Sequence, residues 1–321
     1  MFIHVGDILT RGPHENSLAL LTYLASNNIT GVRGNNDQKV VEWRGWLNWI
    51  TSLSGGRSWL DRLENASPNA ETDKQELIKW MEDQRNAASE SDKEWWNLVP
   101  DQWILFSDHY KVARDMSATE FQYLLDLPLR LYIPSAHAFV VHAGLLPSDP
   151  RFPYYDEARQ PLARVPTSKS NRRVEKLRKL QEISLLTQIP QNLVPWVVLN
   201  MRGILNGEVC KKGEGMTPWS DLWNQQMDSC VGYNFELAHT VDRDGEVSAS
   251  KKHPEQDLPC YPSTVIYGHA ASRGLDLKRW SIGLDSGCVS TFPVYQRLVL
   301  NTHYLIGLWK IFICIGYRRY C

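Results

Sequence analysis

The chain has 321 residues, of which 43% are hydrophobic and 22% charged, so it is long and apolar enough to bury a substantial core. Its 35 basic and 36 acidic residues leave a formal net charge of -1. That balance argues against the strongly basic type of nucleic-acid binder and against a protein held to membranes by charge, so no nucleic-acid partner is expected. The six cysteines contain no C-x-x-C pair, which indicates neither a zinc ribbon nor a disulfide scaffold.

The sequence begins with two units of the same kind. Residues 2–5 are a short apolar run that ends at Gly6-Asp7, and a helical pattern over residues 17–25 follows a polar turn. A second apolar run leads through residues 29–37 into a tryptophan-rich helical pattern over residues 40–53. Two strand-loop-helix units in succession predict an α/β sheet, in which the loops at the carboxyl ends of the strands gather at one edge.

Two more predicted strands end in histidines. Residues 138–141 run directly into His142, and residues 263–267 are followed by Gly268-His269. The long excursion between them, residues 149–259, is expected to form a covering subdomain.

Helical segments account for much of the remaining chain. The polar stretch 61–93 is expected to form exposed helices, and Ser117 with Glu120 has the spacing of a capping box at the start of a short amphipathic helix. Trp43, Trp46 and Trp49 recur at helical spacing, which favours core packing over a platform for stacking bases. The longest apolar stretch, residues 304–317, contains Lys310 and is shorter than the about 20 residues of a bilayer crossing, so no membrane span is expected.

The four predicted strand ends together present one carboxylate, one amide and two imidazoles. These are Asp7, Asn35, His142 and His269, all of ligand types that suit Mn, Fe or Zn. Singly, each has an ordinary explanation, because an Asp or Asn after a strand usually serves a turn or a helix cap. Their joint occurrence at the ends of four strands predicts one metal site.

The motifs around these residues resemble those of the calcineurin-like metallophosphatases, in the family's order and over about residues 1–300. They are GDILTRG (6–12), RGNND (33–37), VVHAG (140–144) and YGH (267–269). Within the superfamily, GLDSGCV (283–289) looks like the closing motif of the bacterial diadenosine-tetraphosphatase type, and residues 193–205 with TPWSDLW (217–223) are similar to the fungal endopolyphosphatase branch. The resemblance implies an α/β fold, an α-β-β-α sandwich of two sheets packed face to face, here without its first strand.

The resemblance further implies a site with two divalent metal ions, Mn, Fe or Zn. Asp7 would bridge the ions, and Asn35, His142 and His269 would complete the second. A metal-bound hydroxide would attack phosphorus directly, without a covalent enzyme intermediate.

Substrate contacts follow from the same motifs. Arg11 would hold a phosphate oxygen with its planar, always charged guanidinium, and Asn36 and Asp37 occupy catalytic positions of the second motif. Arg33 and Arg273 lie beside motifs, where they either contact substrate or pair with a carboxylate.

Two departures from the family pattern stand out. The family begins with a strand that ends in D-x-H and supplies the first metal, and the sequence has no such motif ahead of Gly6; His4 lies on the strand itself and is no substitute. Asn36 stands where the family has a histidine credited with protonating the leaving group, and an amide cannot donate that proton. Because a phosphate leaving group departs largely unaided, Asn36 favours phosphoanhydride substrates over phosphoserine.

The basic run over residues 169–179 leaves two interpretations open. It is either a binding track for a polyanion or a solvated helix face. The solvated face is favoured, because most runs of charged residues lie on such faces.

These observations predict a metallophosphatase domain over residues 1–300, with insertions at about 57–100 and 150–260, and an off-pattern tail over residues 301–321. The favoured function is hydrolysis of phosphoanhydrides or phosphoesters, polyphosphate first. The alternatives are a serine/threonine protein phosphatase, a dinucleoside tetraphosphatase, an inactive phosphate- or partner-binding relative, and an incomplete copy of an active protein. The resemblance suggests the vacuole, otherwise the cytoplasm, and the oligomeric state is left open.

Overall fold

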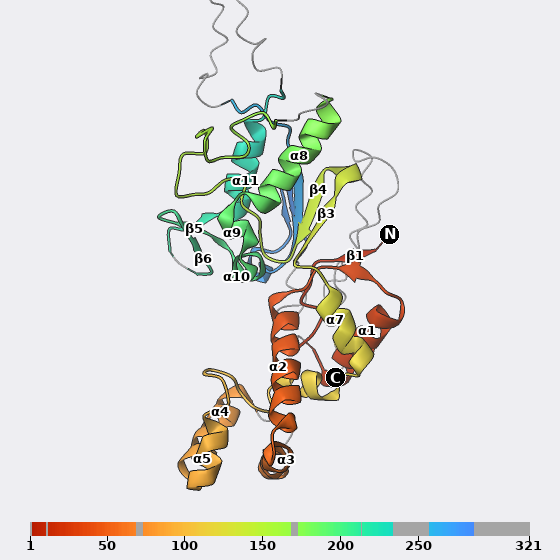
Figure 1. Ribbon diagram of the computed structural model, residues 1–321, viewed down its shortest axis with the longest axis vertical. Helices are drawn as coiled ribbons and strands as arrows, with labels where there is room; N and C mark the ends of the chain where they lie inside the picture. The colour runs from red at the N-terminus through yellow and green to blue at the C-terminus, as the bar shows by residue number, and fades with distance from the viewer. Residues whose placement is uncertain are drawn as a thin grey trace, which may run out of the picture. The chain divides into compact units, whose positions relative to one another are not determined.

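The computed structural model describes residues 2–10, 12–68, 73–167, 173–212, 214–233 and 257–285. It is a mixed α/β structure, as the sequence predicts (Figure 1). The chain divides into two compact units. The sheet unit comprises residues 2–6, 30–34 and the described residues from 128 on, and the helical unit comprises residues 7–29 and 35–127.

The helical unit is built around a core of tryptophans and aliphatic side chains. Trp43 and Trp46 are buried and meet edge to face with ring centroids 5.4 Å apart, which confirms their predicted packing role, whereas Trp49 is 46% exposed. The predicted capping box is present, with Ser117 and Glu120 bonding reciprocally at the start of α7. The helices in its described residues are α1 (His14–Ser26), α2 (Asn35–Ser52), α3 (Gly56–Ala66), α4 (Lys74–Asn86), α5 (Glu90–Trp96), α6 (Asp108–Asp115) and α7 (Ala118–Asp126).

The sheet unit contains three separate sheets in its described residues. A parallel pair is formed by β1 (Ile3–His4) and β2 (Thr30–Gly31). A mixed sheet has the order β3-β4-β8-β10-β9, in which β4, β8 and β10 run parallel. Its strands are β3 (Arg130–Ile133), β4 (Ala138–Val141), β8 (Thr264–Tyr267), β9 (Asp276–Leu277) and β10 (Ser281–Gly283). An antiparallel sheet of order β6-β5-β7 is made by β5 (Gly203–Leu205), β6 (Glu208–Cys210) and β7 (Thr217–Pro218).

Helices cover one face of the mixed sheet. Phe139 and Val141 alternate along β4 and point into a core that also takes Leu185 of α8 and Trp223 of α11, and Figure 1 shows both helices beside the sheet. The excursion between β4 and β8 therefore supplies the cover that the sequence predicts. Its helices are α8 (Val174–Thr187), α9 (Pro190–Leu193), α10 (Pro195–Asn200) and α11 (Trp219–Asp228), and 3-10 turns lie at η1 (Pro134–Ala136) and η4 (Ala271–Arg273).

A disulfide joins Cys230, just after α11, to Cys260, which is fully buried ahead of β8. The cysteine spacing gave no reason to expect it, because the two residues are 30 positions apart and belong to no short motif. The bond closes a long loop and so stabilises the end of α11 against the segment that enters β8.

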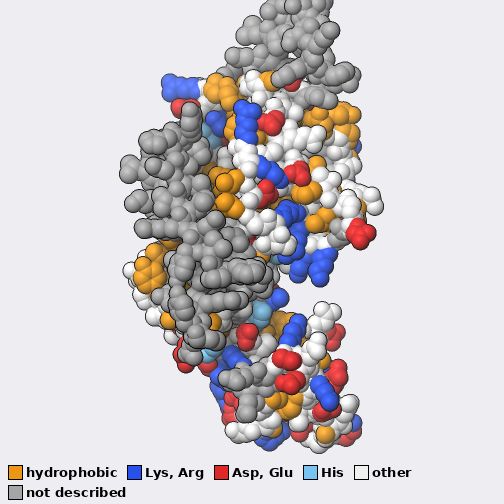
Figure 2. Space-filling view, turned by 180° about the vertical axis from the view of Figure 1, so that it is seen from behind, with side chains coloured by type: hydrophobic (Ala, Val, Ile, Leu, Met, Phe, Trp, Pro, Cys, Tyr) orange, Lys and Arg blue, Asp and Glu red, His pale blue; other side chains and the backbone are white. Residues whose placement is uncertain are grey.

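No helix in the described ranges is long and apolar enough to cross a membrane. Figure 2 shows acidic and basic side chains of the described residues interspersed over the face it presents, in line with a formal net charge of -1.

Candidate active site

The ends of the four predicted strands come together in the sheet unit. Because β4 and β8 pair in parallel, their carboxyl ends reach the same edge, where Gly268 donates its backbone N–H to the His142 carbonyl at 2.9 Å. The parallel pair of β1 and β2 likewise brings Gly6 against Gly34. Gly268 also lies against the Val5 side chain, so both strand pairs meet at one place.

His142 and His269 face each other at this place. His142 is buried, and its Nδ1 lies 2.8 Å from the Val5 carbonyl. Because a carbonyl only accepts, Nδ1 carries a proton, and Nε2 is the ring nitrogen that faces His269. His269 Nδ1 lies 3.2 Å from that Nε2. A backbone carbonyl that fixes the tautomer of an imidazole is the usual support of a histidine that binds metal.

Asp7 lies in the helical unit, at the first turn of α2. Its Oδ1 accepts the backbone N–H of Asn36 at 2.8 Å, and its Oδ2 accepts from the Asn36 side-chain Nδ2 at 2.7 Å. These two bonds orient both oxygens of the Asp7 carboxyl group at the N-terminus of α2.

Asp37 holds the backbone of the same loop. It is fully buried, and its two carboxylate oxygens accept the backbone N–H groups of Asp7 at 2.8 Å and Ile8 at 3.0 Å. Asp37 thus supports the backbone of the loop that carries Asp7. Asn35 is partly buried and begins α2.

Two of the predicted ligands adopt an unusual backbone conformation. Asp7 has φ 55° and His269 has φ 66°, both in the left-handed region that disfavours residues with a Cβ. Strain of this kind persists where surrounding contacts over-determine the conformation, and it clusters at functional sites.

His4 serves the structure of this region. Its ring lies against Gly31, and its Nδ1 accepts the Gly6 N–H at 3.3 Å. Burial lowers the pKa of His4 to about 4, so the ring is neutral at physiological pH. These contacts agree with the reading of His4 as a strand-side residue.

The sheet unit also brings two arginines beside His269. Arg202 donates to the His269 carbonyl at 3.4 Å, and Arg273 donates to the Arg202 carbonyl at 2.8 Å. Arg202 Nε and Arg273 Nη1 are buried without a hydrogen-bond partner, and in the part of the chain that the structure describes no carboxylate pairs with either guanidinium. Arg273 was a candidate from the sequence, whereas Arg202 was missed.

The structure gives less information on the other two predicted arginines. Arg11 lies outside the described residues. Arg33 is partly buried in the sheet unit and donates its backbone N–H to the Pro128 carbonyl at 3.0 Å.

The basic run is described from residue 173 on. Arg178 donates to the Pro262 carbonyl at 2.6 Å and forms a 3.3 Å ion pair with buried Glu182. This member of the run therefore secures α8 to the segment that enters β8. Residues 169–172 of the run, residues 286–289 of the closing motif and the tail 301–321 lie outside the described residues.

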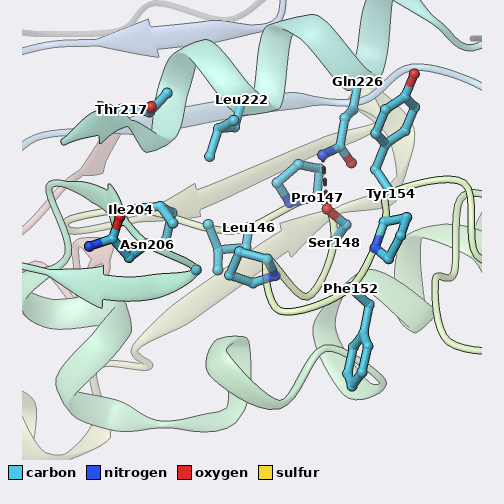
Figure 3. A pocket seen from close by; sticks show the side chains of 13 residues that line it. Leu146, Pro147, Ser148, Phe152, Tyr154, Ile204, Asn206, Thr217, Leu222 and Gln226 are labelled. Atoms are coloured by element: carbon cyan, nitrogen blue, oxygen red, sulfur yellow. Dashed lines mark hydrogen bonds between the residues drawn. The ribbon is translucent and has the colours of Figure 1, made fainter. Parts of the chain in front are cut away.

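The sheet unit contains a pocket of about 350 Å³ that is lined by none of the predicted site residues. Figure 3 shows Leu222 and Gln226 of α11 on one side of it and the loop with Leu146 and Ser148 on the other. Gln226 donates to Ser148 at 2.8 Å, and no charged side chain of the described residues lines the pocket.

The predicted ligands suit a divalent cation in their chemistry. A carboxylate and imidazole nitrogens are common ligands of Mn, Fe and Zn, and the support of His142 by Val5 is of the kind that such sites use. The residues present therefore fit the metal that the motifs predict.

Comparison with known proteins agrees with the motifs. Residues 1–141 match the family model described as calcineurin-like phosphoesterase. This match supports the metallophosphatase superfamily over residues 1–141. No curated protein matched the chain.

A solved structure described as "a putative diadenosine tetraphosphatase" is similar to the chain with 19% sequence identity and a TM-score of 0.39. The similarity covers 89% of this chain and 70% of the other.

Proposed function

We propose that the protein is a metal-dependent hydrolase of phosphoanhydrides and phosphoesters that acts first on polyphosphate. The observation that carries the proposal is the pair of guanidinium groups of Arg202 and Arg273 beside His269, with buried nitrogens that no carboxylate of the described residues neutralises. Both arginines are partly buried and have no carboxylate partner among the described residues, so they suit an anionic ligand. Two adjacent arginines suit a substrate with more than one phosphate.

In this proposal Asp7, His142, His269 and Asn35 are the metal ligands, as the motif resemblance implies. Chain connectivity supports the set. His142 bonds to the Val5 carbonyl, and Asp7 follows Val5 by two positions, while Asn35 follows Gly34 directly. Of the two ions that the motifs imply, these residues would hold the second. A bound divalent cation supplies Lewis-acid polarisation of a phosphoryl oxygen.

The chain's own residues then have defined tasks. Asn36 holds the Asp7 carboxylate, Asp37 holds the loop, and the arginines bind and orient the phosphates. Orientation of the substrate phosphate against the metal ligands lowers the activation barrier, because the entropy cost of bringing the reacting groups together is met on binding.

Removal of metal is expected to abolish phosphate release from polyphosphate, and Mn²⁺, Fe²⁺ or Zn²⁺ to restore it. His142→Asn is expected to prevent the recovery, because it removes a ligand, whereas His137→Asn on the same β4 hairpin should retain it. Phosphate release is measured before and after chelation on polyphosphate, diadenosine tetraphosphate and a phosphoserine peptide. Hydrolysis that resists chelation contradicts the metal dependence. No hydrolysis of any substrate with any metal contradicts the proposal and favours a phosphate-binding relative.

Asn36→His is expected to raise the hydrolysis of phosphoserine or aryl esters by about tenfold relative to that of polyphosphate. An imidazole at this position can donate a proton to a poor leaving group, and general acid catalysis matters most there. The rates of the wild type and of Asn36→His are compared on each substrate. Equal factors on esters and anhydrides would show that residue 36 does not set substrate preference.

We further propose that the protein works in an oxidising compartment, the vacuole being the candidate from the family resemblance. The disulfide between Cys230 and Cys260 supports this, because disulfides are rare in reducing cytosol.

A further inference from the structure

His109 lies where the first turn of α2 begins, although it belongs to a helix far along the chain. Its Nε2 is 3.1 Å from the Asn36 Oδ1 and 3.3 Å from the Thr10 hydroxyl. We propose that His109 is a positioning residue of the candidate metal site, which fixes the Asp7 carboxylate through the Asn36 amide. The inference rests on the proposed function only in taking Asp7 as a metal ligand.

The packing of α6 against α2 places His109 there. Tyr110 is buried and meets the Trp43 ring edge to face at 5.2 Å. Arg44 donates to the Ala113 and Met116 carbonyls, both at 2.9 Å, and so satisfies the end of α6. With its middle and end held along α2, α6 presents its first turn to the first turn of α2.

The hydrogen bonds fix the direction of each donor. Asp7 presents a carboxylate that can only accept, so Asn36 must turn its Nδ2 toward Asp7 and its Oδ1 toward His109. Oδ1 can only accept, so His109 Nε2 carries the proton and donates it. The opposite orientation of the amide would set its oxygen against the carboxylate.

This chain of donors acts on both oxygens of one carboxylate. The Asn36 backbone N–H holds Oδ1 of Asp7, and the side chain that His109 orients holds Oδ2. Asn36 itself is 4% exposed, so water cannot readily replace His109 as its partner. Loss of the His109 donor leaves a buried carbonyl oxygen unsatisfied and releases the amide to rotate.

Two variants test this role. His109→Leu removes the donor, and His109→Gln retains an N–H that can reach Asn36. The control is His14→Leu, because His14 is a histidine of the same unit that bonds to Asp115 at 2.9 Å and not to Asn36. Thermal melts establish that each variant is folded.

The first readout is the side-chain amide signal of Asn36 in metal-free protein with labelled asparagine. We expect hydrogen exchange of this amide to be slow in the wild type, in His109→Gln and in His14→Leu, and fast in His109→Leu. Slow exchange in folded His109→Leu would overturn the proposal. This result does not depend on catalysis or on metal.

The second readout is the affinity for added Mn²⁺, measured by calorimetry. His109→Leu is expected to weaken it about tenfold, as loss of a residue behind a ligand does, and His109→Gln to restore most of it. Unchanged affinity in His109→Leu would contradict the link to Asp7. Failure of the wild type to bind Mn²⁺ would instead contradict the proposed function, and the exchange of the Asn36 amide would still decide the positioning role.

Discussion

Replacing Gly6 with alanine is expected to lower the free energy of unfolding by about 3 kcal/mol or more, as measured by denaturant titration. Gly6 has φ +86°, a left-handed conformation that costs a residue with a Cβ about 1–2 kcal/mol. A Cβ there would also lie 2.5 Å from the Gly34 nitrogen and 2.7 Å from its Cα. Since both atoms are backbone, the strain cannot be relieved by a side-chain rotation, and overpacking adds about 1–3 kcal/mol.

Gly12→Ala is the matched control, because Gly12 belongs to the same motif. A Cβ at Gly12 meets no atom within 4 Å, so this variant should change the free energy of unfolding by less than about 1 kcal/mol. Gly6→Ala is also expected to lower metal affinity, because Asp7 is the next residue. Equal stability of the two variants would contradict the close approach of the two motif loops.

The part of the site that lies at strand ends was predictable from the sequence. A short apolar run followed by a polar ligand type identifies a strand and its carboxyl end, and the pairing of β4 with β8 confirms that His142 and His269 reach one edge. The carboxyl ends of parallel strands lie at the same edge of a sheet. Each ligand can therefore be located from the sequence of its own strand alone.

Residues that enter the site through packing were not predictable in the same way. His109 comes from α6, and its place depends on Trp43, Tyr110 and Arg44, none of which marks a function. Arg202 precedes β5 in a stretch that the sequence offered only as a family likeness. Its signal is an arginine beside a glycine at the start of a strand, too common a pattern to single out.

The roles within the second motif also required three-dimensional contacts. The sequence placed Asn36 and Asp37 together as catalytic residues. In the structure the Asn36 side chain faces Asp7, whereas both Asp37 oxygens accept backbone N–H groups. Neighbours in sequence therefore support Asp7 differently, because successive residues at a helix start point in different directions.

Arg202→Met is expected to lower kcat/KM for polyphosphate about a hundredfold while leaving the free energy of unfolding unchanged or raising it. A charged hydrogen bond to phosphate contributes up to about 3 kcal/mol, which corresponds to such a factor. The free protein loses little, because the Arg202 guanidinium pairs with no carboxylate of the described residues and its Nε is buried without a partner. The Arg202 carbonyl, which accepts from Arg273, is retained in the variant.

Arg130→Met provides the opposite pattern within the same unit. Arg130 donates to the Leu186 and Asn192 carbonyls at 2.9 and 2.5 Å, and no predicted site residue contacts its side chain among those that the structure describes. Its loss should therefore lower the free energy of unfolding by about 1–3 kcal/mol and leave kcat/KM unchanged. Steady-state kinetics and denaturant titration on both variants separate the two roles. If Arg202→Met instead destabilises the protein and leaves kcat/KM intact, Arg202 is a structural residue and the substrate phosphates bind elsewhere.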